Sequence, residues 1–361
     1  MRFGSGSYDV RRSEGLNPSL LVASRHEITC TVTFLDSTER QFHIDRHACG
    51  AVLLEKVFDH LELIEKDFFG LQFLYVLGSK ETQKRWLDPM KSIRKQMICP
   101  PFHLLFRVKF YVSDPSKLCE EYTRYHFFLQ LRHDMLEGRL PCAEGSLALL
   151  ASYAVQSELG DYSPSDHPEG YLNQYRFAPS QSIDFPKKVA ELHAMHKGQS
   201  PAEAEYNFLD HAKRLDMYGV ELYPARDGKN LPIGIGVNSY GMVIFHEGSK
   251  INEFAWSTII KISFKRKNFY VQIKFAEQNT PDTVLSFQVN SSPTCKQLWK
   301  TCIEHHTFFR LIAPPIAPPR GILSIGSKYR YCGHIFVSSL FICLLFVFWN
   351  RADTFSIGSI I

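Results

Sequence analysis

Hydrophobic and polar residues alternate in several short runs in the first third of the chain. This period of two predicts half-buried strands. Between the runs, residues 50–63 place Leu53, Val57 and Phe58 on one side, which is the spacing of an amphipathic helix. Together these elements indicate a small ubiquitin-like lobe over residues 26–112. The predicted strands are residues 26–35, 41–44, 69–76 and 103–110.

Helical periodicity replaces this alternation from Asp114 onward. Asp114-Pro115 combines an N-cap residue with a first-turn proline, so we expect a helix to begin there and to bury a face that includes Tyr122. The clearest helix start is Ser200-Pro201-Ala202-Glu203, in which Ser200 caps the helix and Glu203 completes a capping box. This helix is expected to end at Gly219. With further helices at 146–158 and 186–196, residues 113–218 are predicted to form an all-helical lobe.

Alternation returns at Val220 and continues to residue 289. Seven short strands are followed by an amphipathic helix at 293–309, which carries Leu298, Trp299 and Cys302 on its hydrophobic stripe. This layout is typical of a pleckstrin-homology or phosphotyrosine-binding sandwich, here over residues 219–312. Because no Pro/Gly/Ser-rich linker separates the lobes, we expect one compact α+β body. The predicted strands are residues 220–223, 233–237, 242–245, 251–254, 259–264, 269–275 and 284–289.

A cationic turn joins two of these strands. Ile262 and Phe264 alternate with polar residues before it, so Lys265-Arg266-Lys267 falls at the tip of a hairpin. One interpretation is a solvated turn. The other is contact with an acidic membrane surface, where each cation adds about 1 kcal/mol. The sequence leaves both open, but it disfavours nucleic acid because the neighbouring aromatic residues point toward the core.

Composition limits the functional classes. The chain has 361 residues, of which 45% are hydrophobic and 22% charged, and its net charge of +4 is too small to indicate nucleic-acid binding. Its nine cysteines include no C-x-x-C pair. Because no N-terminal signal peptide is recognisable, we expect reduced thiols and a cytosolic location.

The sequence lacks the common catalytic motifs. A tyrosine phosphatase loop needs a cysteine followed by an arginine six residues later. The residue six after Cys49 is Glu55, and no other cysteine meets this spacing. Gly234-Ile235-Gly236 lacks the third glycine of a dinucleotide-binding motif. The histidine pairs His193/His196 and His305/His306 lack acidic or cysteine partners at ligand spacing. We therefore predict a binding module with no catalytic residue, cofactor or metal.

Longer motifs along the chain carry a family resemblance. They include Gly138-Arg139-Leu140-Pro141, Met217-Tyr218-Gly219-Val220, Trp86-Leu87-Asp88 with Lys95, and the runs at 156–162, 200–205 and 304–311. With these motifs, residues 26–312 resemble the FERM domain of the band 4.1 superfamily. Three further runs, at 8–14, 112–118 and 326–333, look most like the N-terminal part of cytosolic tyrosine phosphatases that carry FERM and PDZ modules. Band 4.1 cytoskeletal adaptors share much of the same sequence.

The resemblance implies a three-lobed cloverleaf of ubiquitin-like, acyl-CoA-binding-protein-like and pleckstrin-like lobes. It also implies a site for anionic phospholipids, because FERM domains commonly meet phosphoinositides near the cationic strand turn and a facing part of the first lobe. In this chain the implied lipid-binding residues are Lys265, Arg266, Lys267, Lys91, Arg94 and Lys95.

A peptide groove is expected beside the last helix. Residues 259–264 are predicted to be an edge strand, to which a peptide can add by backbone pairing, with the helix as the floor of the groove. The alternative is that Leu298 and Trp299 are only core residues. The expected groove residues are Ile260, Ile262, Phe264, Leu298, Trp299 and Cys302.

These features predict an adaptor that links the plasma membrane, cytoplasmic tails of membrane proteins and the cortical cytoskeleton. The alternative is the targeting part of a tyrosine phosphatase whose PDZ and catalytic domains are missing from this chain. Residues 1–25 are expected to be a flexible arm, and residues 313–333 a FERM-adjacent segment that includes part of the proline-rich spacer at 312–319. Residues 334–361 are a divergent tail, whose apolar stretch 335–349 would span only ~22 Å as a helix. That stretch is either a marginal anchor or the product of alternative splicing or a misread intron.

Overall fold

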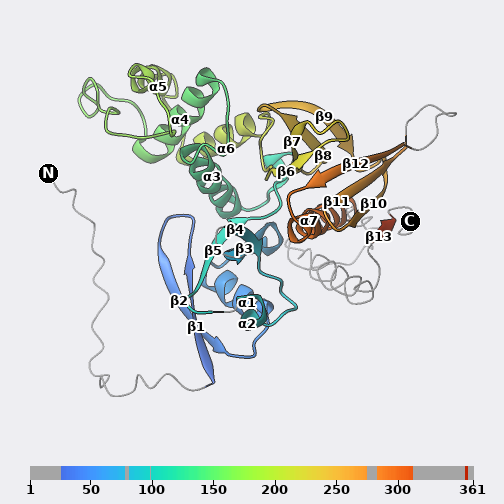
Figure 1. Ribbon diagram of the computed structural model, residues 1–361. Helices are drawn as coiled ribbons and strands as arrows, with labels where there is room; N and C mark the ends of the chain where they lie inside the picture. The colour runs from blue at the N-terminus through green and yellow to red at the C-terminus, as the bar shows by residue number, and fades with distance from the viewer. Residues whose placement is uncertain (1–25, 78–80, 98, 275–282, 312–353, 357–361) are drawn as a thin grey trace, which may run out of the picture.

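The computed structural model describes residues 26–77, 81–97, 99–274, 283–311 and 354–356. These residues form three lobes that meet near the centre of the molecule, as Figure 1 shows. The predictions made above for residues 1–25, 312–333 and 335–349 lie outside the described residues.

The first lobe is a five-stranded sheet in the order β2-β1-β5-β3-β4, in which β1 and β5 run parallel and the other neighbours are antiparallel. Leu53 and Val57 of its long helix are fully buried, as their helical spacing predicts. The sequence analysis missed β4 and the short helix α2. The elements are β1 (Glu27–Thr33), β2 (Glu39–Asp45), α1 (Gly50–His60), η2 (Lys66–Phe68), β3 (Phe69–Leu77), β4 (Glu81–Trp86), α2 (Ile93–Gln96) and β5 (Phe102–Val108).

The second lobe is helical. The Ser200 hydroxyl accepts a hydrogen bond from the Glu203 backbone nitrogen, and the Glu203 carboxylate accepts one from the Ser200 backbone nitrogen, so the predicted capping box is confirmed. The elements are η3 (Pro115–Lys117), α3 (Glu121–Leu136), α4 (Glu144–Leu159), α5 (Phe185–Ala194) and α6 (Pro201–Ala212).

Two helix boundaries in this lobe differ from the prediction. The Asp114 side chain accepts a hydrogen bond from the Ser116 backbone nitrogen, as an N-cap residue should. It caps only the 3₁₀ turn η3, and α3 begins separately at Glu121. Tyr122 is consequently 44% exposed and does not lie on a buried face. The last helix ends at Ala212, and turns occupy the residues up to Gly219.

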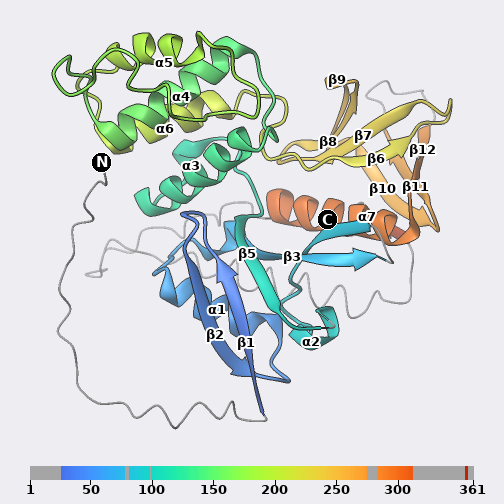
Figure 2. The same cartoon turned by 60° about the vertical axis from the view of Figure 1, so that its left-hand side comes forward.

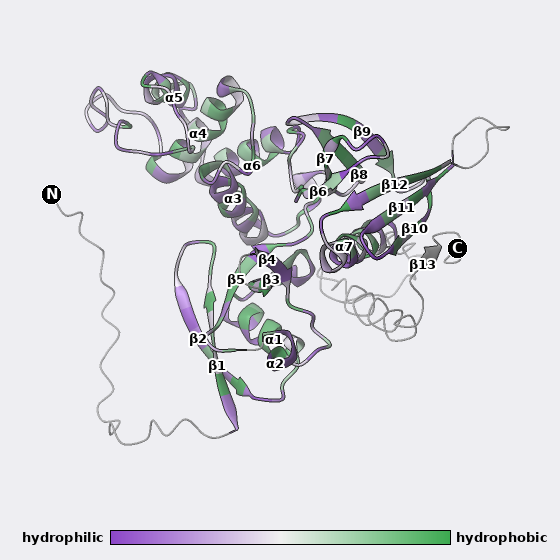
Figure 3. Ribbon diagram, in the orientation of Figure 1, coloured by the Kyte–Doolittle hydropathy of each residue, from purple (hydrophilic) through white to green (hydrophobic). Residues whose placement is uncertain are grey.

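The third lobe has the predicted seven strands and closing helix, although its first strand begins at Tyr223 and not at Val220. The strands pair in the order β10-β11-β12-β6-β7-β8-β9, and the short strand β13 (Thr354–Ser356) pairs with β10. β8 is buried along almost its whole length, and Figure 3 shows hydrophobic segments there and also in the other two lobes, for example on α1 and α4. The elements are β6 (Tyr223–Arg226), β7 (Pro232–Val237), β8 (Gly241–His246), β9 (Ser249–Ala255), β10 (Ile259–Lys265), β11 (Asn268–Ile273), β12 (Thr283–Val289) and α7 (Ser292–Leu311).

Helix α7 connects the third lobe to the first. Figure 2 shows it lying between the strands of the third lobe and β3. Phe308 near its end stacks on Phe110 at a ring distance of 4.1 Å, and Glu304 pairs with Lys109 at 3.1 Å. The first and third lobes therefore share one interface along this helix.

Candidate functional site

The predicted cationic hairpin is present. β10 and β11 are antiparallel, with Lys265 opposite Asn268, so Arg266 and Lys267 form a two-residue turn. Arg266 has a φ of 57°, in the left-handed region that a tight hairpin turn requires. The side chains of Lys265, Arg266 and Lys267 are all exposed, and none has an ion-pair partner among the described residues. The turn therefore presents three uncompensated positive charges to solvent.

This cationic turn lies beside the start of α7. The Val289 backbone nitrogen donates a hydrogen bond to the Lys267 carbonyl at 2.8 Å, and α7 begins at Ser292. Thr294 and Gln297, in the first turns of the helix, contact Gln83 and Lys84 of β4. The hairpin tip is thus close to the line where the third lobe meets the first.

The first-lobe cations border the same helix farther along. Lys91 pairs with Asp88 at 3.1 Å, and Asp88 also pairs with Lys300 of α7. Arg94 and Lys95, on the neighbouring α2, are exposed. Eight residues of helix separate Ser292 from Lys300, which is about 12 Å. The cationic turn therefore lies near the start of α7 and Lys91 lies near Lys300 of the same helix, where Asp88 partly neutralises it.

The predicted floor of the peptide groove lies in the core. Ile262, Leu298 and Cys302 are fully buried, and Trp299 is 7% exposed. An irregularity in the pairing of β10 between Ile259 and Lys261 interrupts the alternation, so Ile259, Ile262 and Phe264 are the β10 residues that belong to the core. The predicted groove residue Ile260 is half-buried and is not part of that core. The Trp299 indole nitrogen donates to the Ile262 carbonyl at 3.3 Å. The core side chains therefore pack under the sheet. An added strand would meet the β10 backbone and the half-buried Ile260 and Phe264.

The outer edge of β10 carries a strand in the structure. The backbone of β13 pairs antiparallel with it, Lys261 opposite Ser356, Ile262 opposite Phe355 and Ser263 opposite Thr354. The sequence analysis did not predict this strand, because three residues are too few to show alternation. This edge of β10 thus has the geometry that accepts an extended segment.

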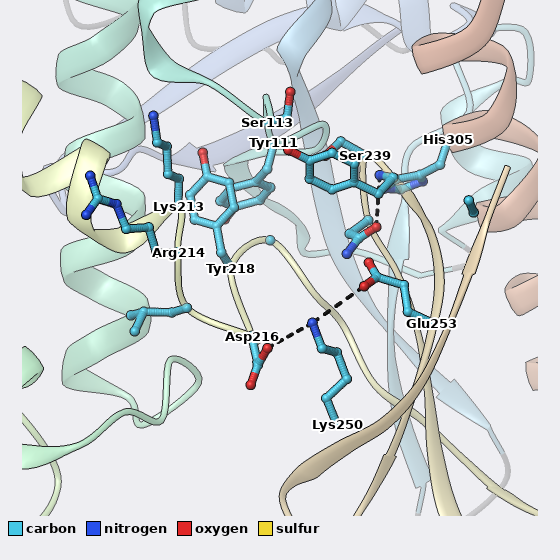
Figure 4. A pocket seen from close by; sticks show the side chains of 15 residues that line it. Tyr111, Ser113, Lys213, Arg214, Asp216, Tyr218, Ser239, Lys250, Glu253 and His305 are labelled. Atoms are coloured by element: carbon cyan, nitrogen blue, oxygen red, sulfur yellow. Dashed lines mark hydrogen bonds and ion pairs between the residues drawn. The ribbon is translucent and has the colours of Figure 1, made fainter. Parts of the chain in front are cut away.

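A cavity of about 450 Å³ lies where the helical and third lobes meet (Figure 4). Lys250 of β9 crosses its mouth, pairing with Asp216 at 3.0 Å and with Glu253 at 3.5 Å. Lys213, on the opposite wall, pairs with Asp210 and Asp114. Both lysines therefore have carboxylate partners, and neither presents an unpaired charge to the cavity. The sequence analysis gave no signal for this cavity, since its residues come from every lobe.

The buried thiols are not activated. Burial raises the pKa of Cys302 far above its usual range and raises that of Cys30 to about 12. Both therefore stay protonated at neutral pH, which is the opposite of a nucleophilic thiolate. No helix in the described part of the chain combines the length and hydrophobicity that a membrane span requires.

Three family models match the chain in the order of its lobes. The FERM N-terminal domain matches residues 32–99, the FERM central domain residues 113–223, and the FERM C-terminal PH-like domain residues 227–316. These ranges correspond to the first sheet, the helical lobe and the strand-rich lobe described above.

Known proteins agree with this assignment. The chain is 52% identical to Tyrosine-protein phosphatase 1 of Caenorhabditis elegans over 92% of its length, which is 33% of that protein. It is 45% identical to human Band 4.1-like protein 3 over 88% of its length, or 29% of that protein. The fold matches a Drosophila Merlin FERM structure with a TM-score of 0.66 at 24% identity, covering 78% of this chain and 96% of that one.

The chain spans about a third of the length of these curated relatives. The three family models match the three lobes in order, and the relatives include a tyrosine phosphatase and a band 4.1-like protein. This chain therefore belongs to the FERM family.

Proposed function

We propose that this chain is an adaptor that binds anionic phospholipids and the cytoplasmic tails of membrane proteins, and so connects the plasma membrane with the cortical cytoskeleton. The observation that carries the proposal is the cationic turn, whose three exposed side chains have no described ion-pair partner. Lys91, near Lys300 of α7, and the exposed Arg94 and Lys95 of α2 add further positive charge in the first lobe. At about 1 kcal/mol per cation near an anionic leaflet, the turn contributes about 3 kcal/mol to membrane binding.

Vesicle binding tests the lipid part. In the variant Lys265→Gln, Arg266→Asn, Lys267→Gln, asparagine is chosen because it tolerates the φ of 57° at position 266. Both the parent and the variant end at residue 333, because the apolar stretch 335–349 would bind vesicles by itself. Binding to phosphatidylcholine vesicles containing a phosphoinositide should fall about a hundredfold in the variant. Raising the salt concentration should weaken the parent and leave the variant nearly unchanged.

A matched control removes the same charge elsewhere. Lys187, Lys197 and Lys229 are exposed and lie in the helical lobe and on a turn of the third lobe. The triple glutamine variant of these three should bind like the parent. If the two triple variants bind equally well, the cationic turn is only a solvated hairpin tip.

We further propose that the outer edge of β10 receives an extended segment of a membrane-protein tail. The pairing of β13 with Lys261–Ser263 supports this, because it uses the backbone that such a segment would use. A chain ending at residue 333 should bind an added peptide that copies residues 350–361. A peptide with proline at 355 and 356 should not bind, since proline removes backbone donors on both parities of the strand. Equal binding of the two peptides would contradict strand addition.

A second candidate function is targeting of a catalytic domain. The 52% identity to a tyrosine phosphatase over the FERM part favours it, and both functions can coexist in a longer protein. The coding sequence downstream of Gly333 in the transcript decides the matter. A PDZ segment followed by a cysteine with an arginine six residues later would establish the phosphatase, whereas their absence would leave the adaptor alone.

A further inference from the structure

A second cavity, of about 240 Å³, lies between the first lobe and the helical lobe. One wall is the turn between β1 and β2 together with the end of α1, and it includes Phe34, Asp36 and His60. The other wall is the first half of α3. Pockets for cofactors and drug-sized ligands are usually about 300–1,000 Å³. This cavity is therefore sized for a single long side chain.

The α3 wall is aromatic and accessible. Tyr122, Tyr125, His126 and Leu129 lie on one side of the helix, at the spacing of neighbouring turns. Tyr122 and Tyr125 are 44% and 37% exposed, with their rings stacked at 6.5 Å. The His126 ring stands edge-on to Tyr122 at 4.4 Å and is anchored to the Tyr122 carbonyl. Tyrosine faces held in this way favour contact with a cation or another flat group.

The facing wall supplies negative charge. Asp36 is exposed, and its Oδ1 accepts hydrogen bonds from the Thr38 backbone nitrogen at 3.0 Å and from the Thr38 hydroxyl at 2.7 Å. Both bonds use the same oxygen, so Oδ2 is the atom that a ligand would meet. Glu62 is exposed just beyond Leu61, which also lines the cavity. Burial raises the pKa of Tyr122, and the charges of Asp36 and Glu62 and the neighbouring Tyr125 act in the same direction.

The histidines add no positive charge to this lining. Burial lowers the pKa of His126, and burial together with Arg40 lowers that of His60, so both rings are neutral at pH 7. Arg40 contacts the His60 ring, with Nη1 at 2.6 Å from Nδ1. Its single charge opposes two carboxylates. The charges around the cavity therefore favour a cation, and its aromatic wall favours a flat group.

We propose that this cavity binds the side chain of an arginine carried by a segment of a partner protein. The guanidinium lies against the tyrosine faces and pairs with the Asp36 carboxylate. Arginine fits better than lysine, because its planar group can stack on a ring and donate in-plane hydrogen bonds at the same time. The site lies apart from both the cationic turn and the edge of β10, so it does not depend on the lipid or tail binding proposed above.

A small peptide tests the proposal on the full chain. The probe is acetyl-Gly-Arg-Gly-amide, and its matched control carries citrulline, which has nearly the same shape without the charge. The readout is the nuclear magnetic resonance of ¹³C-labelled histidine rings. His60 and His126 line the cavity, whereas His193 and His305 are buried elsewhere and serve as internal controls. The arginine peptide should shift only the first pair, and citrulline should bind at least about tenfold more weakly.

Variants test the acidic wall. Asp36→Asn with Glu62→Gln keeps the Oδ1 acceptor of the turn and should weaken the arginine peptide about tenfold. Asp184→Asn with Glu191→Gln makes the same changes at exposed positions beside and within α5 and should have no effect. If the first pair disturbs His193 or His305, Tyr122→Leu serves instead and should weaken binding several-fold through loss of the ring.

Three results would overturn the proposal. The unchanged chain could show no shift of His60 and His126 with the arginine peptide. Citrulline, or a norleucine peptide, could bind as tightly as arginine, which would make the cavity an apolar anchor site. The acidic-wall variant could retain the affinity of the parent.

Discussion

The two junctions of the third lobe are built from similar charges in different surroundings. Where α7 meets the first lobe, Lys109 and Glu304 pair at 3.1 Å with side chains only 16% and 13% exposed. Where the third lobe meets the helical lobe, Lys250 and Asp216 pair at 3.0 Å around an open cavity, with side chains 34% and 59% exposed. The distances are nearly equal, so burial is what separates the two pairs.

This difference in burial predicts that the two junctions contribute differently to stability. A buried charge that loses its partner is costly, since water cannot replace the partner. An exposed pair exchanges readily with water and contributes little. The interface along α7 is therefore expected to hold the first and third lobes together, while the open junction leaves room around the cavity in Figure 4.

The largest expected effect comes from breaking the buried pair. Glu304→Ala leaves Lys109 buried without its partner and should lower the free energy of unfolding by about 3–5 kcal/mol. Urea unfolding followed by tryptophan fluorescence measures the loss. The double variant Lys109→Met with Glu304→Leu, which removes both charges, should recover most of it. A loss below about 1 kcal/mol in the single variant would show that this junction is no stronger than the open one.

A second test of the buried junction uses pH. Burial alone would raise the pKa of Asp88, but Lys300 and Lys91 outweigh it and lower the pKa to about 2. Because the folded-state pKa lies below the unfolded value, the stabilisation is present above about pH 4 and is lost as pH falls toward 2. It amounts to about 2 kcal/mol. Glu304, whose pKa is also lowered, acts in the same direction.

The variant Asp88→Asn isolates this contribution. It keeps the Oδ1 that accepts from the Met90 backbone nitrogen, and it replaces the Oδ2 that pairs with Lys91 and Lys300 by an uncharged amide nitrogen. We expect it to be less stable than the parent at pH 7 and equally stable near pH 2, so the two stability curves should converge on acidification. Curves that stay parallel in urea titrations across this range would rule out Asp88 as a pH-dependent contact of the junction.

Much of the fold could be predicted because its signals are local. The seven strands of the third lobe follow from alternation, and the start of α6 follows from four adjacent residues. β4 was missed because Glu81–Trp86 is mostly polar and shows no alternation. The start of α3 was misplaced because its first donors are held from another lobe: Glu65 accepts from the backbone nitrogens of Cys119 and Glu120 at 3.2 and 3.0 Å.

The same distinction between local signals and contacts across lobes applies to the candidate site. The cationic turn could be predicted from seven consecutive residues, since strand parity and a turn place its charges outward. Of the predicted groove residues, Leu298 and Cys302 are fully buried, because a hydrophobic stripe does not reveal which of its members remain accessible. The irregular pairing beside Ile260 could not be predicted, since it appears only when β10 pairs with β11. The cavity that we propose binds arginine could not be predicted from the sequence, because Asp36 and Tyr122 come together only through the packing of two lobes.

The smallest expected effect comes from the open junction. Lys250→Met removes the charge that bridges Asp216 and Glu253 at the mouth of the cavity, and all three side chains are at least 34% exposed. Exposed pairs contribute about 0.2–1 kcal/mol, and water can take over the two carboxylates, so the free energy of unfolding should change by about 0.5 kcal/mol or less. Added salt should not change the free energy of unfolding of the variant any further, because the ion pair that salt would screen has been removed.

A control, Lys187→Met on the exposed side of α5, measures the effect of the substitution alone. A loss of 2 kcal/mol or more beyond that control would mean that the open junction also holds the lobes together, and the contrast between the two junctions would fail.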